Sequence, residues 1–273
     1  NYPGYNNPYG IVSDTINNLF LTNGATNNDW QANFRAFSSG IQRAYRSPNT
    51  STFSHGYLQP AVDATNRVLF VSNTYSNSIS AYSYNQYGSS FTLVSTLQDA
   101  TDLINPRNFC LDETTDTLYV GLTNGDFTSV DVSNVSSMSV IDRLANVSGN
   151  KLYYDMQIDT TNEVLFGCSV RNKNGITLGG SLYSVDISDS ANLAHLDFIE
   201  RLDDTDFYFP NQMDVDTEDE YLDWCRLWTS ECVACSGTDK LLVIDYSDPS
   251  SLTIHAKSST SNFRQDELIK LIR

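Results

Sequence analysis

Basic residues are scarce in this sequence: only 16 of its 273 residues are Lys or Arg, against 33 Asp and Glu, which gives a formal net charge of −17. A surface of that sign repels polyanions, which argues against nucleic acid and anionic membranes as partners. Long apolar runs are also missing, since no window approaches the about 18 residues that a membrane span requires. The opening residues, NYPGYNNPYG, have neither the basic start nor the apolar run of a secretory signal. We therefore expect no membrane insertion.

Several catalytic signatures are absent as well. The sequence contains no Gly-x-Ser-x-Gly elbow, no P-loop and no dinucleotide-binding fingerprint. Its three His residues are His55, His195 and His255, and the last two fall in or beside predicted outer strands. No His pair is therefore available for general acid and base roles.

The residues that are abundant indicate a folded protein with a polar surface. Hydrophobic residues make up 40% of the chain and aromatic residues 12%, which is too much for a disordered acidic chain. The chain also has 33 Ser, 26 Asn and 24 Thr, but only five Lys. This composition favours an extracellular or cell-surface location.

A strand, a five-residue turn and a second strand recur along the chain at steps of 50, 49 and 47 residues. The four clearest copies are GIVSDTINNLFLTN, AVDATNRVLFVSN, CLDETTDTLYVGL and QIDTTNEVLFGCS. Ser13, Asp63, Asp112 and Asp159 occupy one position of this repeat, six residues before a Leu. A recurring Asp at a tight hairpin, including Asp216 in the fifth copy, is expected to form the turn rather than to catalyse.

Third and fourth strands follow at fixed offsets, so each unit reads as four short strands rich in Val, Ile, Tyr, Phe and Thr. We expect a single domain over 1–273 with repeats at about 9–47, 57–98, 106–145, 153–203 and 209–258. Such units predict an all-β fold, a β-propeller of about five four-stranded blades that allows a six- or seven-bladed ring. A β-sandwich is the alternative. Residues 259–273 are expected to close the ring, to begin a further blade, or to pair with another subunit.

Two kinds of known repeat resemble these units. The segment AVDATNRVLFVSNTYSNSISAYSYNQYGSSFTLVSTL resembles the YVTN-type propeller repeat, whereas LYSVDISDSANLAHLDFI and LLVIDYSDPSSLTIHA are similar to LVIVD-type repeats. The resemblance implies a propeller from families that are mostly secreted or surface-attached, many of them adhesive or scaffolding. It implies architecture more firmly than activity.

Two insertions interrupt the repeat. One adds RNKNGITL-like residues between the second and third strands of the fourth copy. The other, TEDEYLDWCRLWTSE, is placed between the first and second strands of the fifth copy, where Cys232 is taken to lie in the second strand. Tyr221, Trp224 and Trp228 make this segment a candidate for binding a ligand or a partner, while the alternative is that they plug a channel or cover a blade edge.

Five Cys residues, at 110, 168, 225, 232 and 235, allow two disulfides and one remaining thiol. Cys232-x-x-Cys235 lacks a second Cys or His pair, so zinc is not expected. We expect Cys225 to bridge to Cys232 or Cys235, whereas Cys110 and Cys168 are either a second pair or two buried thiols.

Other candidate sites are weaker. Asn49, Asn134 and Asn146 begin sequons in predicted turns and are candidate glycosylation sites. Asp155, Asp206 and Asp214 lie near the starts of predicted inner strands, where a Ca²⁺ ion could bind, although no cofactor is required by the sequence.

These observations predict an extracellular structural or interaction module that binds protein or glycan partners through loops, and is not an enzyme. A calcium-dependent lactonase-like propeller hydrolase is the first alternative. The second is a self-associating subunit of a homopolymeric extracellular filament.

Overall fold

The computed structural model is all-β and describes residues 7–17, 19–25, 33–38, 41–46, 60–87, 90–145, 151–173, 176–201, 212–216, 221–225 and 242–257. Across these ranges, no helix is long or apolar enough to cross a membrane. The only helical segments described are two single 3-10 turns, η1 (Thr74–Ser76) and η2 (Val135–Ser137).

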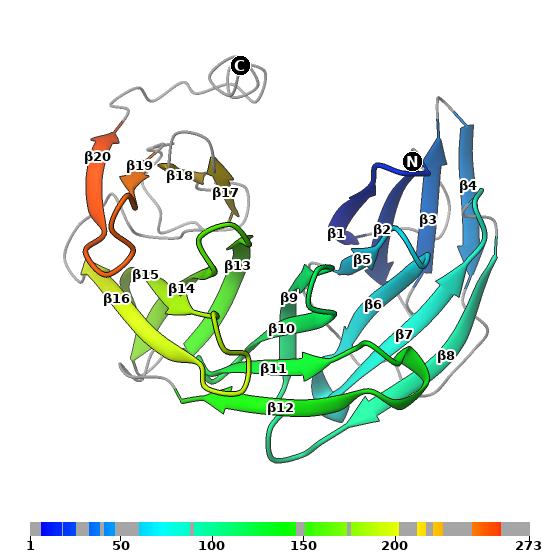
Figure 1. Ribbon diagram of the computed structural model, residues 1–273. Helices are drawn as coiled ribbons and strands as arrows, with labels where there is room; N and C mark the ends of the chain where they lie inside the picture. Colours follow the sequence, from blue (N-terminus) through cyan, green and yellow to red (C-terminus); the bar gives the residue numbers. More distant parts are fainter. Residues whose placement is uncertain are drawn as a thin grey trace. The chain divides into compact units, whose positions relative to one another are not determined.

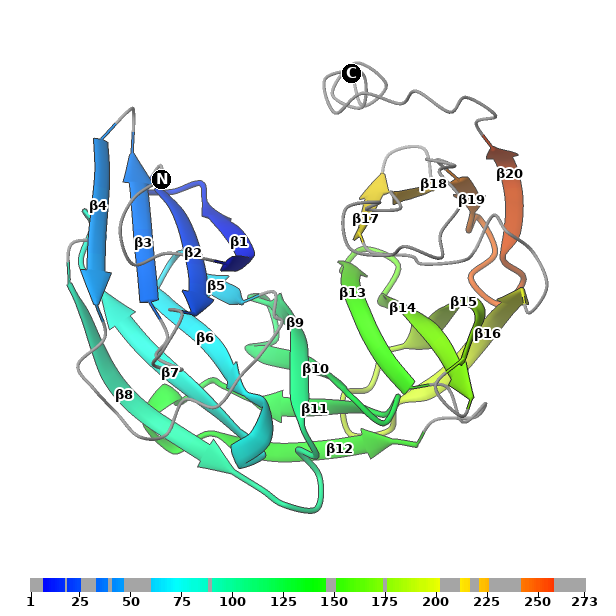
Figure 2. The same cartoon turned by 180° about the vertical axis from the view of Figure 1, so that it is seen from behind.

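The described strands form five four-stranded antiparallel sheets, each with its strands paired in chain order (Figures 1 and 2). The first sheet contains β1 (Asn7–Asp14), β2 (Leu19–Ala25), β3 (Asn33–Ser38) and β4 (Ile41–Arg46). The second contains β5 (Ala61–Asp63), β6 (Val68–Asn73), β7 (Ser78–Tyr84) and β8 (Phe91–Gln98). The third contains β9 (Pro106–Asp112), β10 (Thr117–Leu122), β11 (Phe127–Asp131) and β12 (Ser139–Leu144).

The fourth sheet contains β13 (Lys151–Asp159), β14 (Val164–Lys173), β15 (Ile176–Asp186) and β16 (Ala194–Arg201). The fifth contains β17 (Gln212–Asp216), β18 (Tyr221–Cys225), β19 (Leu242–Asp245) and β20 (Thr253–Lys257). This repeated four-stranded meander confirms the predicted β-propeller of about five blades, and the β-sandwich alternative is wrong.

An Asp side chain closes the hairpin between the first two strands of a sheet. In the second sheet, Asp63 Oδ1 accepts a hydrogen bond from the Asn66 main-chain N–H at 2.7 Å, and Asp63 Oδ2 accepts one from Asn66 Nδ2 at 2.8 Å. The same Asp position forms the turn in three other sheets, through Asp14 with Asn17, Asp112 with Thr114 and Thr115, and Asp159 with Asn162. The predicted turn-forming role of this residue is therefore confirmed for these hairpins.

The structure corrects the register of the first copy and adds a feature of the turn. Asp14, not Ser13, is equivalent to the other Asp residues, because Asp14 pairs with Leu19 across the hairpin. The last turn residue adopts a left-handed conformation in three sheets, with φ of 56° at Arg67, 50° at Asp116 and 57° at Glu163. This conformation brings the chain back into the second strand.

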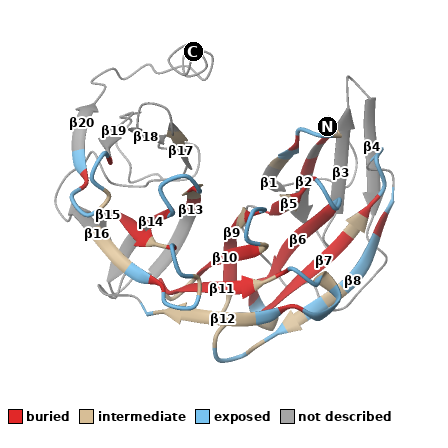
Figure 3. Cartoon of the chain, viewed as in Figure 1, coloured by how far each residue is buried: buried red, intermediate tan, exposed pale blue. Residues whose placement is uncertain are grey.

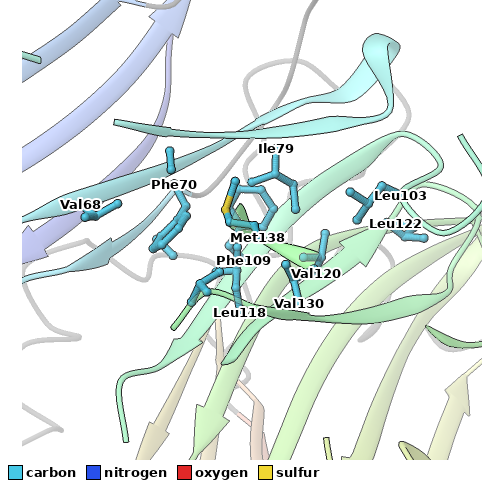
Figure 4. Close-up of a cluster of buried hydrophobic side chains, with 13 residues drawn as sticks. Val68, Phe70, Ile79, Leu103, Phe109, Leu118, Val120, Leu122, Val130 and Met138 are labelled. Carbon is cyan, nitrogen blue, oxygen red and sulfur yellow. The ribbon is translucent and has the colours of Figure 1, made fainter. Parts of the chain in front are cut away.

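Apolar side chains pack between successive sheets of the N-terminal half. Phe70 and Ile79 of the second sheet face Phe109, Leu118 and Val120 of the third sheet, as Figure 4 shows. A second cluster joins the first and second sheets, and consists of Leu19, Leu21, Leu69, Val71, Tyr82, Tyr84 and Phe91. Strand β6 is buried on both faces because alternate side chains enter different clusters (Figure 3).

Hydrogen bonds from Ser hydroxyls also tie the second, third and fourth sheets to a turn that follows a third strand further along the chain. Ser129 Oγ donates to the Ser190 carbonyl at 2.6 Å, and Ser184 Oγ donates to the Pro249 carbonyl at 2.6 Å. Ser95 Oγ donates to the carbonyl of Val135 in the same way. In each case the accepting carbonyl lies four residues after the end of β11, β15 or β19.

The two predicted insertions have different outcomes. Strands β14 and β15 are ten and eleven residues long, so the extra residues of the fourth copy do extend the predicted hairpin. In the fifth copy the prediction is wrong, because Asp216 pairs with Tyr221 and YLDWC is itself the second strand, β18. Asp216 pairs with Tyr221 as Asp159 pairs with Val164, so the extra residues of the fifth copy fall between β18 and β19 in the sequence.

The chain divides into two compact units. Unit 1 consists of Asn1–Val147 with Ser190–Asn192, and unit 2 consists of Ser148–Asp189 with Leu193–Arg273. The described parts of unit 1 include the first three sheets, and those of unit 2 include the last two.

Candidate functional site

The first strands of three sheets carry a bulge near their starts. The register shifts between Pro8 and Gly10 in β1, between Pro106 and Asn108 in β9, and between Tyr153 and Asp155 in β13. The residues left out of the pairing include Tyr9, Arg107 and Tyr154, each five positions before the Asp of the turn. Bulges frequently re-aim side chains beside functional sites, so these positions are the first candidates.

Strand β9 places a cation and an amide at its bulge. Arg107 is 8% exposed and Asn108 is 2% exposed. Among the residues whose burial the structure describes, Arg107 is the only buried Lys or Arg. A buried guanidinium is costly unless other groups compensate its charge, and its N–H donors suit carbonyl and carboxylate oxygens.

The end of β6 holds the start of β9. Thr74 Oγ1 donates a hydrogen bond to the Pro106 carbonyl at 2.8 Å, and the Asn105 N–H donates to Asn77 Oδ1 at 2.8 Å. Thr74 and Asn77 belong to the hairpin that joins β6 to β7. Asn105 directly precedes β9, and Pro106 is its first residue. The residues that precede Arg107 are thereby fixed to the second sheet.

Two buried polar atoms lie at the same end of β6. Ser72 Oγ and Asn73 Oδ1 have no hydrogen-bond partner within the described part of the protein. The Asn73 amide nitrogen does donate, to Ser78 Oγ at 3.2 Å and to Ser80 Oγ at 2.9 Å. An unsatisfied buried acceptor costs about 1–3 kcal/mol, which a bound water or a ligand hydroxyl would recover.

A buried carboxylate occupies the equivalent place in unit 2. Asp155 lies four residues before the turn residue Asp159, as Asn108 lies four before Asp112, and it is 5% exposed. Asp155 Oδ1 accepts a hydrogen bond from the Met156 N–H at 2.8 Å. A carboxylate in this setting has the chemistry of a general base.

Arg143 belongs to a different, closed arrangement in the third sheet. Its guanidinium donates to Asp126 Oδ2, and its Nη1 lies 3.5 Å from Asp102 Oδ1. Burial alone would lower the pKa of Arg143, but hydrogen bonds and charge from Asp126 and Asp102 raise it above its usual value. These bonds join β12 to the β10–β11 hairpin, so we assign the cluster to structure.

The turn carboxylates are likewise structural. Burial alone would raise the pKa of Asp112, but hydrogen bonds from Thr114 and Thr115 hold it below its ordinary value. These carboxylates shape their own turns. Among the residues whose burial the structure describes, Asp155 is the buried carboxylate of a first strand that is not part of such a turn.

The residues predicted to bind a partner are placed only in part. Tyr221 and Trp224 lie in strand β18 rather than in an insertion loop, and Trp228 is outside the described residues. Of the predicted cation ligands, Asp155 is in β13 and Asp214 in β17, while Asp206 is outside the described residues. Within the described ranges, no three His, Cys, Asp or Glu side chains are grouped as a metal site would require.

Cysteines and sequons have mixed outcomes. Cys110 and Cys168 are buried thiols and do not form the second disulfide that was one of two expectations. Each lies within its own sheet, in β9 and β14 respectively. Cys225 is in β18, and the proposed bridges to Cys232 or Cys235 involve residues outside the described ranges. Asn134 is exposed and its side chain caps η2, whereas Asn49 and Asn146 are outside the described residues.

Arg107, Asn108, Ser72 and Asn73 were not predicted from the sequence. The available signal was position: Arg107 stands five residues before a turn Asp, in a chain with few cations. Its burial could not be inferred, because the bulge that removes it from the strand alternation is visible only in the structure.

Comparison with known families gives two matches. Residues 42–147 match the family described as "Lactonase, 7-bladed beta-propeller", and residues 226–260 match the LVIVD repeat. The first match corrects the YVTN-type resemblance, while the second agrees with the LVIVD-type resemblance of the fifth copy. A comparison with curated proteins found no match.

Solved structures share the fold at low identity. The periplasmic gluconolactonase PpgL of Pseudomonas aeruginosa is 10% identical, with a TM-score of 0.67 over 94% of this chain and 71% of that one. A Bacteroides uniformis protein named as a 6-phosphogluconolactonase is 11% identical, with a TM-score of 0.61 over 95% and 88%. Hydrazine synthase of Kuenenia stuttgartiensis is 14% identical, with a TM-score of 0.56 over 92% and 66%.

The predicted role as a non-catalytic structural or interaction module is corrected by these findings, because the matched family is one of lactonases. The family match covers less than half of the chain, and the similar structures carry different activities on one architecture. Together with the five four-stranded sheets, the comparisons identify this chain as a β-propeller.

Proposed function

We propose that the chain is a lactonase-type hydrolase, which opens a cyclic ester by addition of water. One observation carries the proposal: buried Arg107 and the Ser72 and Asn73 oxygens, which have no hydrogen-bond partner among the described residues, all lie within the segment 42–147 that matches the lactonase family. The bond from Thr74 to the Pro106 carbonyl holds these two short segments together.

The reaction needs little beyond oriented hydrogen-bond donors and a base. The oxygen of water adds to the lactone carbonyl carbon, the ring C–O bond breaks, and the ring oxygen leaves as a hydroxyl after it takes up a proton. Negative charge develops on the carbonyl oxygen, where Arg107 and the Asn108 amide are the proposed donors. Ser72 and Asn73 are proposed to bind substrate hydroxyls, since their buried acceptors have no partner in the described protein.

The attacking water gives up its proton to solvent or buffer. Within unit 1, catalysis is therefore assigned to stabilisation of the charge that develops on the carbonyl oxygen.

The charge of the chain supports a neutral sugar lactone over a phosphorylated one. With a net charge of −17, the surface slows the approach of anionic substrates. A phosphate group is usually bound by several cations or main-chain N–H groups, whereas Arg107 is the single buried cation among the described side chains. We also propose a location outside the cytoplasm, supported by the Ser-, Asn- and Thr-rich composition and by the periplasmic relative.

The test is release of acid from glucono-δ-lactone in a pH-stat, with spontaneous hydrolysis subtracted and 6-phosphogluconolactone as the second substrate. We expect R107A to lose about 100-fold or more in kcat/KM, as for removal of a donor to a developing oxyanion, and R107K to retain part of the activity.

A matched variant controls for general damage. R67N replaces an exposed Arg in a turn of unit 1 with a residue that tolerates φ of 56°, and it should leave the rate unchanged. Absence of any acceleration over the spontaneous reaction with either lactone, or full activity of R107A, would overturn the proposal.

A further inference from the structure

One stretch of the chain has no charge. The 31 residues from Val68 to Gln98 contain no Asp, Glu, Lys, Arg or His, although charged residues make up 18% of the whole sequence. This stretch spans β6, β7 and β8, which are three of the four strands of the second sheet. Strands β6 and β7 are buried, so their lack of charge follows from packing, but β8 is not.

Strand β8 is the last strand of its sheet and is largely exposed. It pairs with β7 on one side and has no strand partner on the other among the described strands. Figure 3 shows its mostly exposed and intermediate residues beside the buried β6 and β7. Leu93 is 46% exposed and Val94 38%, and they are two of the five large hydrophobic residues exposed in the described chain.

The other fourth strands are protected by charge. Charged side chains on edge strands prevent pairing with another molecule, because they would have to be desolvated. Such residues occur in every other fourth strand, namely Arg43 and Arg46 in β4, Asp142 and Arg143 in β12, Asp197, Glu200 and Arg201 in β16, and Lys257 in β20. The sequence of β8, FTLVSTLQ, has none and is rich in residues that favour strands.

We propose that β8 pairs antiparallel with β8 of a second copy of this chain to form a twofold-symmetric dimer. Two copies with a charge of −17 each repel one another over most of their surface, and an uncharged edge is where main chains can approach at the lowest electrostatic cost. A twofold axis requires an edge complementary to itself, which an uncharged strand satisfies. Main-chain hydrogen bonds supply the association, and Leu93 and Val94 add apolar contact. The proposal is independent of the hydrolase activity.

Sedimentation velocity of the full chain tests this proposal. We expect the weight-average mass to rise with concentration from 30.5 kDa toward twice that value, and to rise further when NaCl is increased from about 20 to about 500 mM, because salt screens repulsion between the copies. V94K should weaken the association by at least about tenfold, since it places a like charge on both copies at the edge.

The matched control is S139K, which adds a Lys to an exposed position of β12, a fourth strand that already carries charge. S139K should dimerise like the unaltered chain, and circular dichroism melting should show that both variants are folded. A chain that stays monomeric at all concentrations and salt levels would contradict the proposed dimer. So would a dimer that V94K leaves intact, because the contact would then lie elsewhere.

Discussion

Tyr84 and Asp14 form a buried hydrogen bond between the first two sheets. The Tyr84 hydroxyl donates to Asp14 Oδ2 at 2.6 Å, and the same carboxylate accepts from the Asn17 N–H and side-chain amide. In unit 2, Tyr246 donates to Asp159 Oδ2 at 3.0 Å in the same arrangement. Thus the turn carboxylate both shapes its own hairpin and accepts a hydrogen bond from a Tyr at the end of, or directly after, the third strand of the next sheet.

Y84F should destabilise the protein at neutral pH and make its stability less sensitive to alkali. Burial, together with the hydrogen bond and charge of Asp14, raises the pKa of Tyr84 above its ordinary value. The stability that Tyr84 contributes is therefore complete below about pH 10, where the unfolded residue is neutral, and it declines as the pH rises beyond that. Urea unfolding at pH 7 and pH 10.5 measures both effects.

At pH 7 we expect Y84F to cost about 1.5–3 kcal/mol, as for a hydrogen bond to a charged group. Y246F is the matched variant and should cost less, since its bond to Asp159 is longer. An equal fall in stability from pH 7 to 10.5 for Y84F and the unaltered chain would contradict the assignment.

Single residues were the hardest to predict from sequence. Asp63, Asp112 and Asp159 were assigned correctly to turns because a recurring position has a recurring structural cause. Arg107 occurs once and carries no repeated signal, so its burial emerges only when the bulge in β9 and the adjacent β6–β7 hairpin are seen.

At the scale of elements, the first hairpins are built on a strained position. Glu163 has φ of 57° and is exposed, and the left-handed conformation costs a residue with a side chain roughly 1–2 kcal/mol. Glycine adopts this conformation without that penalty, but loses more conformational freedom on folding.

E163G should therefore raise the free energy of unfolding by about 0.5 kcal/mol. D116G is the comparison in unit 1, and should gain less because Asp tolerates the left-handed region better than Glu does. Chemical denaturation of the two variants beside the parent chain measures the difference. A loss of stability in E163G would show that the Glu side chain contributes more than its backbone costs.

Element boundaries were predictable wherever the Asp turn was recognised. The second, third and fourth copies of the repeat give first hairpins in the register observed, because the turn chemistry fixes the register of the hairpin. In the fifth copy, the predicted second strand around Cys232 is wrong, and Asp216-Thr-Glu-Asp-Glu-Tyr221 has the same sequence pattern as the turn of the fourth copy. Loop length was therefore a weaker signal than turn residues.

At the scale of the whole molecule, stability arises between sheets. Phe70 of β6 packs with Phe109, Leu118 and Val120 of the third sheet, so its removal acts on two sheets at once. A sheet of this kind buries its faces only by stacking on its neighbours.

F70A should cost about 3–5 kcal/mol and should accelerate hydrogen exchange in β6, β7, β9 and β10 together. Peptide-resolved exchange by mass spectrometry measures this. L93A, at an exposed site of β8, is the control and should leave exchange in β9 and β10 unchanged. Loss of protection confined to β6 and β7 would argue that each sheet is stable by itself.

The Ser hydroxyls that donate to main-chain carbonyls of later turns affect how far the amino-acid sequence can diverge in evolution. Ser129 and Ser184 are satisfied by main-chain oxygens of Ser190 and Pro249, which any amino acid would supply. A mutation in the accepting turn therefore leaves the accepting carbonyl oxygen in place. The sequences of neighbouring sheets can then change independently of one another. This freedom is consistent with solved structures that superpose on nearly all of this chain while sharing only about one residue in ten with it.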